Sequence, residues 1–228
     1  MKFILIIIFA ILILKIYQEK IHIDFKSFFK KGFKKVDNKF GLFCYTGKQG
    51  KGKTYSAIKF ITDQKIKYNY KILTNVKSFD LFEDTLFFED INDIIDYCVQ
   101  FKGNDKNVII FFDEIFTILE KKTPINKKIL SFLSQLRKRK IIFVTTAQEW
   151  SEINITFRRY VRYQISCNMF SIPIFKNAII YNTINDGDLI RWNNDIQDFE
   201  APRISANLSK GNESVINSYD TFETIATK

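Results

Sequence analysis

Eight consecutive residues carry the clearest chemical pattern in this chain of 228 residues. The segment from Gly47 to Thr54 reads GKQGKGKT and fits G-x-x-x-x-G-K-[ST] at every fixed position. In this pattern the glycines let backbone N–H groups curl around a β-phosphate. Lys53 would reach the β- and γ-phosphates, and the hydroxyl of Thr54 would bind Mg²⁺. The sequence therefore predicts a phosphate-binding loop that takes ATP or GTP.

The surroundings of this loop support the prediction. The apolar run 40–45 precedes it, and a helix-permissive segment, 54–66, follows it. Strand, glycine-rich loop and helix N-terminus form the context in which such a loop binds phosphate. The predicted nucleotide site consists of Gly47, Lys48, Gln49, Gly50, Lys51, Gly52, Lys53, Thr54 and Tyr55.

Two adjacent carboxylates follow a second buried strand. Asp113 and Glu114 come directly after the apolar run 108–112. At the carboxyl end of such a strand, Asp113 would hold Mg²⁺, directly or through water. Glu114 would orient and polarise an attacking water as a general base. The alternative is a solvated acidic pair at a strand end.

A glutamine closes the next buried strand. Gln148 follows the run 141–147, and in a parallel sheet that end faces the phosphate-binding loop. Its amide would bond both the γ-phosphate and the attacking water, as glutamine does in other NTPases. The alternative is a loop glutamine that caps Trp150 or Ser151.

Arginines cluster on the far side of this strand. The chain has seven arginines, and five of them lie between residues 137 and 162. Arg137 ends a predicted helix and Arg158 lies ten residues after Gln148. Either would serve as an arginine finger that a neighbouring subunit supplies to the phosphates. Contact with DNA phosphates and simple surface charge remain open alternatives.

The elements that must position these residues alternate along the chain. Strands are predicted at 42–46, 70–76, 107–113 and 141–146, and helices at 54–66, 91–101 and 128–137. Continuous apolar strands separated by helices predict an α/β fold whose parallel sheet is covered on both faces. Further strands at 161–166 and 178–182 would extend this sheet in the antiparallel sense.

The amino-acid composition restricts the partners and the kinds of catalysis that the protein can have. The net charge of +10 suits nucleic acid or an anionic membrane surface, although part of the lysine excess is typical of an AT-rich genome. The three cysteines are scattered singly, which indicates buried thiols in a reducing compartment. A single histidine, His22, excludes histidine-based metal sites and Ser-His-Asp catalysis.

Both ends of the chain differ from its middle. Residues 3–14 are unbroken apolar, and seven lysines follow before residue 36. We expect an N-terminal membrane anchor at 1–17, a basic juxtamembrane linker at 18–39, and an ATPase domain at 40–185 on the cytoplasmic side. A buried strand or helix is the alternative for the apolar run. Residues 186–228 are polar and predict an extension that is loosely structured from Ser205 onward.

Together these pieces resemble the Zot/pI-type ATPases of filamentous phages. The resemblance rests on the residues Thr46–Gly47–Lys48, Leu73–Thr74–Asn75–Val76, Asp113–Glu114, Arg137, Gln148 and Arg158. It covers about residues 40–165 and extends to the FtsK–HerA-like superfamily of hexameric DNA pumps, which also holds genome-packaging ATPases. Two features depart from the family pattern. The apolar segment is N-terminal, whereas Zot-type proteins place theirs after the ATPase, and Lys51 replaces a small residue.

The resemblance implies a P-loop NTPase of the RecA/FtsK-like type that uses ATP and Mg²⁺. It also implies a homo-oligomeric ring, with a hexamer as the first expectation, and DNA, a membrane and phage capsid or assembly proteins as partners. The expected function is a motor that couples ATP hydrolysis to phage DNA packaging or extrusion at the host cytoplasmic membrane or an internal virion membrane. A nucleotide-binding assembly scaffold and a small-molecule kinase are the alternatives.

Overall fold

The computed structural model divides the chain into two compact units, Met1–Asp37 and Asn38–Lys228. It describes residues 4, 7, 10, 11, 14, 40–76, 82–100, 108–115, 124–172 and 177–217. The described residues of the first unit are helical and exposed, but most of the predicted anchor and all of the predicted linker before residue 40 lie outside the described residues. Within the described parts, no helix has the length and apolar character that a membrane crossing requires.

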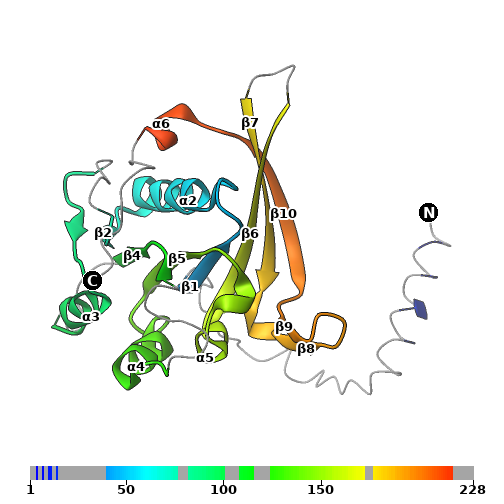
Figure 1. Cartoon of the computed structure of the whole chain (residues 1–228), viewed down its shortest axis with the longest axis horizontal. Coiled ribbons are helices and arrows are strands. Elements are labelled where there is room, and N and C mark those ends of the chain that lie inside the picture. The colour runs from blue at the N-terminus through cyan, green and yellow to red at the C-terminus, as the bar shows by residue number, and fades with distance from the viewer. Residues whose placement is uncertain are drawn as a thin grey trace. The chain divides into compact units, whose positions relative to one another are not determined.

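Eight strands of the second unit form one sheet in the order β10-β7-β6-β1-β5-β4-β2-β3 (Figure 1). Neighbouring strands from β6 to β3 are parallel, whereas β7 and β10 extend the sheet in the antiparallel sense. The strands are β1 Gly41–Thr46, β2 Lys71–Thr74, β3 Leu86–Phe87, β4 Val108–Phe112, β5 Ile141–Ala147, β6 Val161–Ile172, β7 Asn177–Asp186 and β10 Arg203–Lys210.

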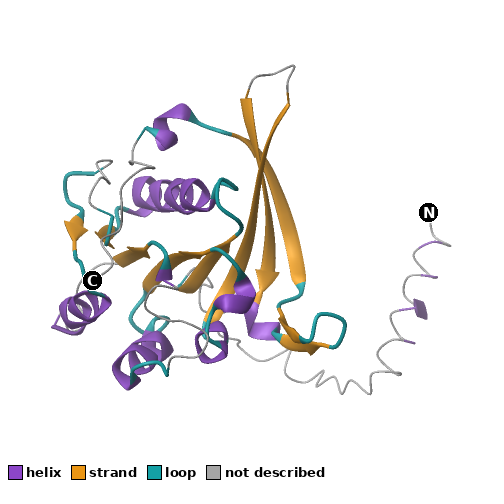
Figure 2. Cartoon of the chain, in the orientation of Figure 1, coloured by secondary structure: helices purple, strands orange, loops and turns teal. Residues whose placement is uncertain are grey.

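Helices cover both faces of the parallel part of the sheet (Figure 2). One face carries α2 (Lys53–Tyr68) and the short α6 (Glu213–Ile216), and the other carries α3 (Ile91–Gln100), α4 (Lys127–Gln135) and α5 (Ile155–Arg158). Two short 3₁₀ helices, Trp150–Glu152 and Gly187–Leu189, lie in connections. A separate hairpin joins β8 (Arg191–Asn193) to β9 (Asp198–Glu200).

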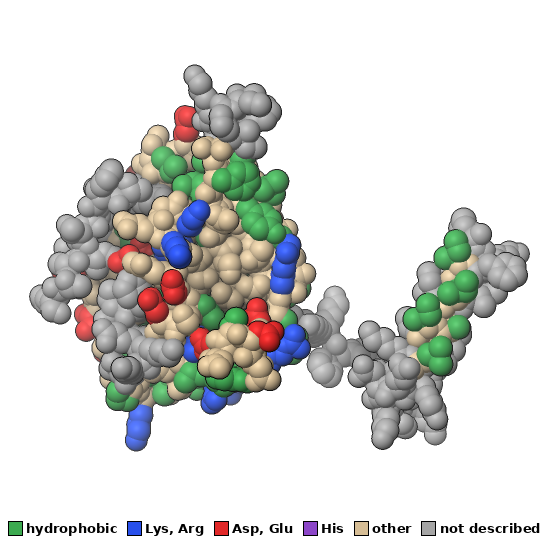
Figure 3. Space-filling view, turned by 45° about the vertical axis from the view of Figure 1, so that its right-hand side comes forward, with side chains coloured by type: hydrophobic (Ala, Val, Ile, Leu, Met, Phe, Trp, Pro, Cys, Tyr) green, Lys and Arg blue, Asp and Glu red, His purple; other side chains and the backbone are tan. Residues whose placement is uncertain are grey.

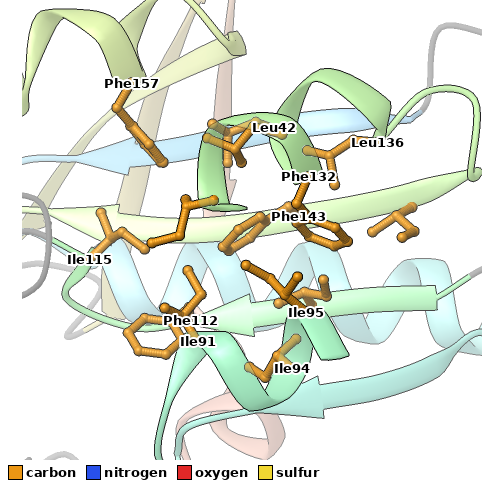
Figure 4. Packing of buried hydrophobic residues seen from close by; sticks show 14 of the residues in the cluster. Leu42, Ile91, Ile94, Ile95, Phe112, Ile115, Phe132, Leu136, Phe143 and Phe157 are labelled. Carbon is orange, nitrogen blue, oxygen red and sulfur yellow. The ribbon is translucent and has the colours of Figure 1, made fainter. Parts of the chain in front are cut away.

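The core consists of two apolar layers, one on each face of the sheet. On β4, Ile109 and Phe111 face the α2 layer, while Ile110 and Phe112 face the α3 and α4 layer that Figure 4 shows. This is why the strand has a continuous apolar sequence and not an alternating one. Burial of each such side chain contributes about 1.5–3 kcal/mol. The two layers therefore fix the strand ends from which the site is built.

The predicted α/β architecture is confirmed, and the seven core elements lie within about two residues of their expected bounds. The C-terminal prediction is wrong in part. Residues from Ser205 onward were expected to be loose, but β10 pairs with β7 along its length and α6 packs on α2. Because β10 belongs to the main sheet, the structure shows no division at the predicted boundary after residue 185.

Candidate active site

Four connections meet at one edge of the sheet. The phosphate-binding loop follows β1, Asn75 follows β2, Asp113 follows β4 and Gln148 follows β5. These strands are parallel, so all four lie at the carboxyl ends. The register pairs Thr46 of β1 directly with Ala147 of β5. The structure thus brings together residues that are about 100 positions apart in the sequence, 47 to 148.

The loop between β1 and α2 requires glycine where it approaches other backbone. Gly47 has φ +151°, its N–H donates to the Gln148 carbonyl at 3.1 Å, and a Cβ there would lie 2.7 Å from the Cys167 carbonyl oxygen. Gly52, with φ +79°, is the N-cap of α2 and provides no side-chain cap. The first N–H groups of α2 therefore remain available to an anion.

Lys53 and Thr54 lie at the start of α2, as the pattern predicts. The ammonium group of Lys53 donates to the Lys48 carbonyl at 3.4 Å, so the side chain folds back over the loop. Tyr55, which was predicted in the nucleotide site, has a buried side chain whose hydroxyl accepts a bond from the Asn212 N–H at 2.7 Å. Tyr55 can therefore contribute to the site only through its backbone N–H. Lys48 and Gln49 are exposed, whereas Lys51 is partly buried beside Gly47.

Asp113 lies beside Thr54, where a magnesium ion would bind. The Thr54 hydroxyl donates to Asp113 Oδ2 at 3.4 Å, and the Thr146 hydroxyl donates to Oδ1. Burial, with a smaller effect of the Glu114 charge, raises the pKa of Asp113 from 3.8 to about 6, against the opposing effects of the two hydroxyls and Lys53. A hydroxyl and a buried carboxylate are oxygen ligands of the kind that Mg²⁺ binds together with phosphate oxygens and water. The residues present therefore fit the ion.

Asn75 holds the backbone of Asp113 from the neighbouring strand. The Asp113 N–H donates to Asn75 Oδ1 at 2.8 Å, and Asn75 Nδ2 donates to the Asp113 carbonyl at 3.2 Å. The side chain thus replaces backbone pairing just past the point where β2 and β4 stop pairing, at Thr74 and Phe111. Asn75 was noted in the sequence only as part of a family pattern, and the structure gives it this positioning role.

Glu114 takes a backbone conformation that is rare for a side-chain-bearing residue. Its φ is +52°, and its N–H donates to the Thr146 hydroxyl at 2.9 Å. The same hydroxyl donates to Asp113, so one group on β5 fixes the predicted metal ligand Asp113 and the backbone of the predicted general base Glu114. No sequence pattern predicted a role for Thr146. The one available signal was a hydroxyl residue in a buried strand, two residues before Gln148.

Gln148 lies beside the loop, where it was expected. Its carbonyl accepts from the Gly47 N–H, and its side chain is exposed at the same edge as the loop. The side chain is therefore free to turn toward a bound γ-phosphate. Its role in positioning water stays a prediction.

Arg158 does not fit the predicted role of a finger. Its side chain is 2% exposed and donates to the Asp198 carboxylate at 3.0 Å, and its guanidinium lies 5.7 Å from the centre of the Trp150 ring. It holds the β8–β9 hairpin against the turn after β5. A buried, paired guanidinium cannot extend into a neighbouring subunit, so this structure gives Arg158 a structural role and overturns the prediction.

Arg137 and Arg159 occupy the opposite edge of the sheet. Arg137 is half exposed and binds Asp188 at 2.8 Å, close to Gly41 at the start of β1. β1 has six residues, so this edge is roughly 17 Å from the loop. Arg137 therefore cannot act in its own site. Arg159, which sequence analysis did not consider as a finger, is exposed, and no acidic side chain within the described residues pairs with it.

These two arginines flank a cleft of about 280 Å³. Gly41, Leu133, Ser134 and Tyr160 also contribute to its lining. The space-filling view in Figure 3 shows Lys and Arg side chains along the lower margin of the larger unit. Asp188, which pairs with Arg137, also lines this cleft, so Arg159 is the arginine there that has no acidic partner among the described residues.

The fold and this site together define a P-loop nucleoside triphosphatase. The chain belongs to the ATPase family associated with various cellular activities (AAA), whose model matches residues 43–170, more than half of the 228 residues. No curated protein is similar to it in sequence at a significant level.

Solved structures share its fold. The N-terminal domain of zonular occludens toxin from Neisseria meningitidis is 14% identical with a TM-score of 0.53, covering 79% of this chain and 98% of that one. The genome packaging NTPase B204 from Sulfolobus turreted icosahedral virus 2, in complex with sulfate, is 12% identical with a TM-score of 0.50, covering 73% of this chain and 97% of that one. B204 has also been solved with AMPPCP, at 13% identity, a TM-score of 0.50, and 72% and 97% coverage. The predicted resemblance to Zot-type and packaging ATPases is confirmed at the level of the fold.

Proposed function

We propose that this ATPase couples ATP hydrolysis to the translocation of viral DNA, in genome packaging or in virion assembly and extrusion. The observation that carries the hydrolytic part is the Thr146 hydroxyl, which fixes Asp113 and the backbone of Glu114 beside the phosphate-binding loop. Asp113 would serve nucleotide binding through Mg²⁺ in any case, so support for hydrolysis comes from Glu114, the candidate general base, whose backbone the same hydroxyl holds next to Asp113.

The site would work by positioning and charge. The loop N–H groups and the start of α2 bind the phosphates, and Lys53 swings from the Lys48 carbonyl to the β- and γ-phosphates. Thr54 and Asp113 would hold Mg²⁺, which neutralises charge on the phosphate oxygens. Glu114 takes the proton of the attacking water, and the exposed amide of Gln148 orients that water.

Further observations support the DNA and membrane parts of the proposal. B204 is described as a genome packaging NTPase, and the net charge of +10 suits a polyanionic substrate. The apolar run 3–14 motivates a membrane location, with the ATPase unit on the cytoplasmic side. Capsid or assembly proteins would be partners at that membrane.

Oligomerisation would complete the site. The exposed Arg159 and the half-exposed Arg137 lie at the edge opposite the loop, so they can reach nucleotide only in another subunit. A head-to-tail ring places one edge of each subunit against the other edge of the next. We propose such a ring, with a hexamer as the first expectation.

Hydrolysis by the full-length protein, with and without DNA, tests the function. We expect DNA to stimulate ATP turnover, and Lys53→Ala and Glu114→Gln to reduce it by at least about 100-fold. Glu114→Gln should retain nucleotide binding, whereas Lys53→Ala should weaken it. Lys67→Ala is the control because Lys67 is exposed on α2 away from the loop.

Unchanged hydrolysis by Lys53→Ala would refute the proposal. Nucleotide binding without turnover, together with an unaffected phage yield for Glu114→Gln, would favour an assembly scaffold. Phosphoryl transfer to a small acceptor would favour a kinase.

A further inference from the structure

The antiparallel hairpin of β6 and β7 contacts the phosphate-binding loop and its flanking residues at four points. Beyond the register pair Thr46–Ser166, β6 continues past the end of β1 and runs alongside the loop. The Cys167 carbonyl lies against Gly47, as described above. Met169 and Ile180 lie within 3.7 Å of a Cβ placed on Gly52. These two packing contacts touch both ends of the loop.

A buried polar network makes the third contact, at the residue before the loop. Asn185 of β7 donates to Gln164 Oε1 at 2.8 Å, and Gln164 Nε2 donates to the Thr46 hydroxyl at 3.1 Å. Gln164 is 7% exposed and Thr46 is 4% exposed. Buried polar groups of this kind tolerate little displacement, because a lost partner leaves another group unsatisfied.

The fourth contact lies on the other face of the sheet. Asn182 of β7 donates to the hydroxyl of Ser56 at 3.0 Å, and Ser56 lies in the first turn of α2, two residues after Thr54. Through Gln164, the hairpin therefore contacts Thr46, the last residue before the loop. Through Asn182, it contacts Ser56 of α2, the helix that follows the loop.

We propose that the β6–β7 hairpin is a positioning element for the loop, and that nucleotide binding in turn restricts the motion of the hairpin. Gln164 and Asn182 are positioning residues, because they act through Thr46 and Ser56 and touch no phosphate themselves. The hairpin carries the edge strand β10 through β6–β7 and β7–β10 pairing, so occupancy of the loop is transmitted to the far edge of the sheet. Nucleotide binding is the only part of the proposed function on which this inference rests.

Hydrogen exchange of the full-length protein tests the coupling without any need for turnover. We expect ADP or a non-hydrolysable ATP analogue to slow exchange in residues 164–169 and 180–185 as well as in the loop. Thr46→Val and Gln164→Leu remove the polar link with little change of side-chain volume. In these variants, saturating nucleotide should still slow hydrogen exchange in the loop but should slow exchange in the hairpin much less.

Affinity and turnover provide the second measurement. We expect each variant to bind nucleotide about tenfold more weakly, the order seen when groups that orient a binding residue are removed, with kcat little changed. Because both substitutions remove the bond between Gln164 and Thr46, the effects of the two on affinity should be less than additive in the double variant. Thr46→Ser keeps the hydroxyl and should restore the wild-type affinity. Tyr181→Phe is the matched control, since it removes a hairpin contact with Arg203 away from the loop.

Three outcomes would overturn the inference. One is hydrogen exchange in the hairpin that nucleotide does not change, while nucleotide slows exchange in the loop. Another is a loss of thermal stability in Thr46→Val and Gln164→Leu without a change in affinity. The third is additive effects in the double variant. A wild-type protein that binds nucleotide without hydrolysing it would refute the proposed function but leave this inference intact.

Discussion

At the scale of single residues, the site depends on one hydroxyl. Thr146 donates to Asp113 and accepts from the Glu114 N–H, at the point where Glu114 takes a left-handed backbone conformation. Such conformations persist only where neighbours hold them. Thr146 therefore joins the metal-binding carboxylate and the general base in one rigid arrangement.

Replacing Thr146 with valine should lower kcat by about 10- to 100-fold and leave nucleotide affinity nearly unchanged. Valine has the same shape but neither donates nor accepts, so the Asp113 carboxylate and the Glu114 backbone lose their common support while the loop is untouched. Thr146→Ser keeps the hydroxyl and should recover most of the rate. Steady-state kinetics and a nucleotide titration measure both quantities. Equal loss in the serine and valine variants would contradict this role.

The raised pKa of Asp113 makes a prediction about stability in the absence of metal and nucleotide. An unfolded Asp113 releases its proton near 3.8 and the folded one near 6. The folded state therefore holds the proton more tightly, and stability falls as the pH rises through this range. Asp113→Asn removes the penalty and keeps the hydrogen-bonding shape, so it should be more stable at pH 7.5, by at most about 3 kcal/mol.

Thermal unfolding in EDTA at pH 7.5 and pH 4 measures this effect. The difference between Asp113→Asn and wild type should largely disappear at pH 4, where the carboxyl is mostly protonated in the folded state. Asp63→Asn is the control, because Asp63 is exposed and its ion pair with Lys59 is of the kind that contributes little. A less stable Asp113→Asn at pH 7.5 would contradict the prediction.

The sequence alone predicted the positions of the loop, Asp113, Glu114 and Gln148 at the strand ends, because each follows an apolar strand directly. It failed to separate Arg158 from Arg159. The two are adjacent at the end of α5, where one is buried and the other exposed, and the partner that buries Arg158 is Asp198, which lies 40 positions away. Local pattern carries no information about such a distant contact.

At the scale of elements, the loop and β6 form one packed unit. Gly47→Ala should weaken nucleotide binding and destabilise the protein, because its Cβ would lie 2.7 Å from the Cys167 carbonyl at φ +151°. Gly50→Ala is the informative comparison. It also has a positive φ, +74°, but nothing lies within 4 Å of its Cβ. We expect it to cost about 1 kcal/mol and Gly47→Ala clearly more.

Thermal unfolding and nucleotide titration of the two glycine variants test this packing. Equal effects would mean that backbone strain, and not the approach of β6, sets the requirement for glycine at residue 47. The parallel core elements were predictable because each is a long periodic or continuous apolar segment. β10 was not, because its sequence RISANLSK is polar and its order comes from pairing with β7.

At the scale of the whole molecule, the two edges of the sheet have complementary chemistry. The carboxyl edge holds the phosphate-binding loop, and the amino edge holds Arg137 and Arg159 around a cleft. Two such edges on one subunit are too far apart to cooperate, but on neighbouring subunits of a ring they would face each other. The arrangement therefore predicts a shared site.

Mixing two inactive variants tests whether Arg159 acts in a neighbouring subunit. Arg159→Ala and Lys53→Ala should each lose most hydrolysis, since one lacks the arginine and the other lacks the lysine of its own loop. In a mixture of equal parts, an Arg159→Ala subunit keeps its loop and can receive Arg159 from a Lys53→Ala neighbour. With random assembly, about one interface in four is then intact, so the mixture should recover about a quarter of the wild-type rate.

A mixture of Arg137→Ala with Lys53→Ala tests in the same way whether Arg137 acts in a neighbouring subunit. If hydrolysis recovers only in the Arg159→Ala mixture, Arg159 is the arginine finger. If hydrolysis recovers in neither mixture, neither arginine acts across a subunit boundary.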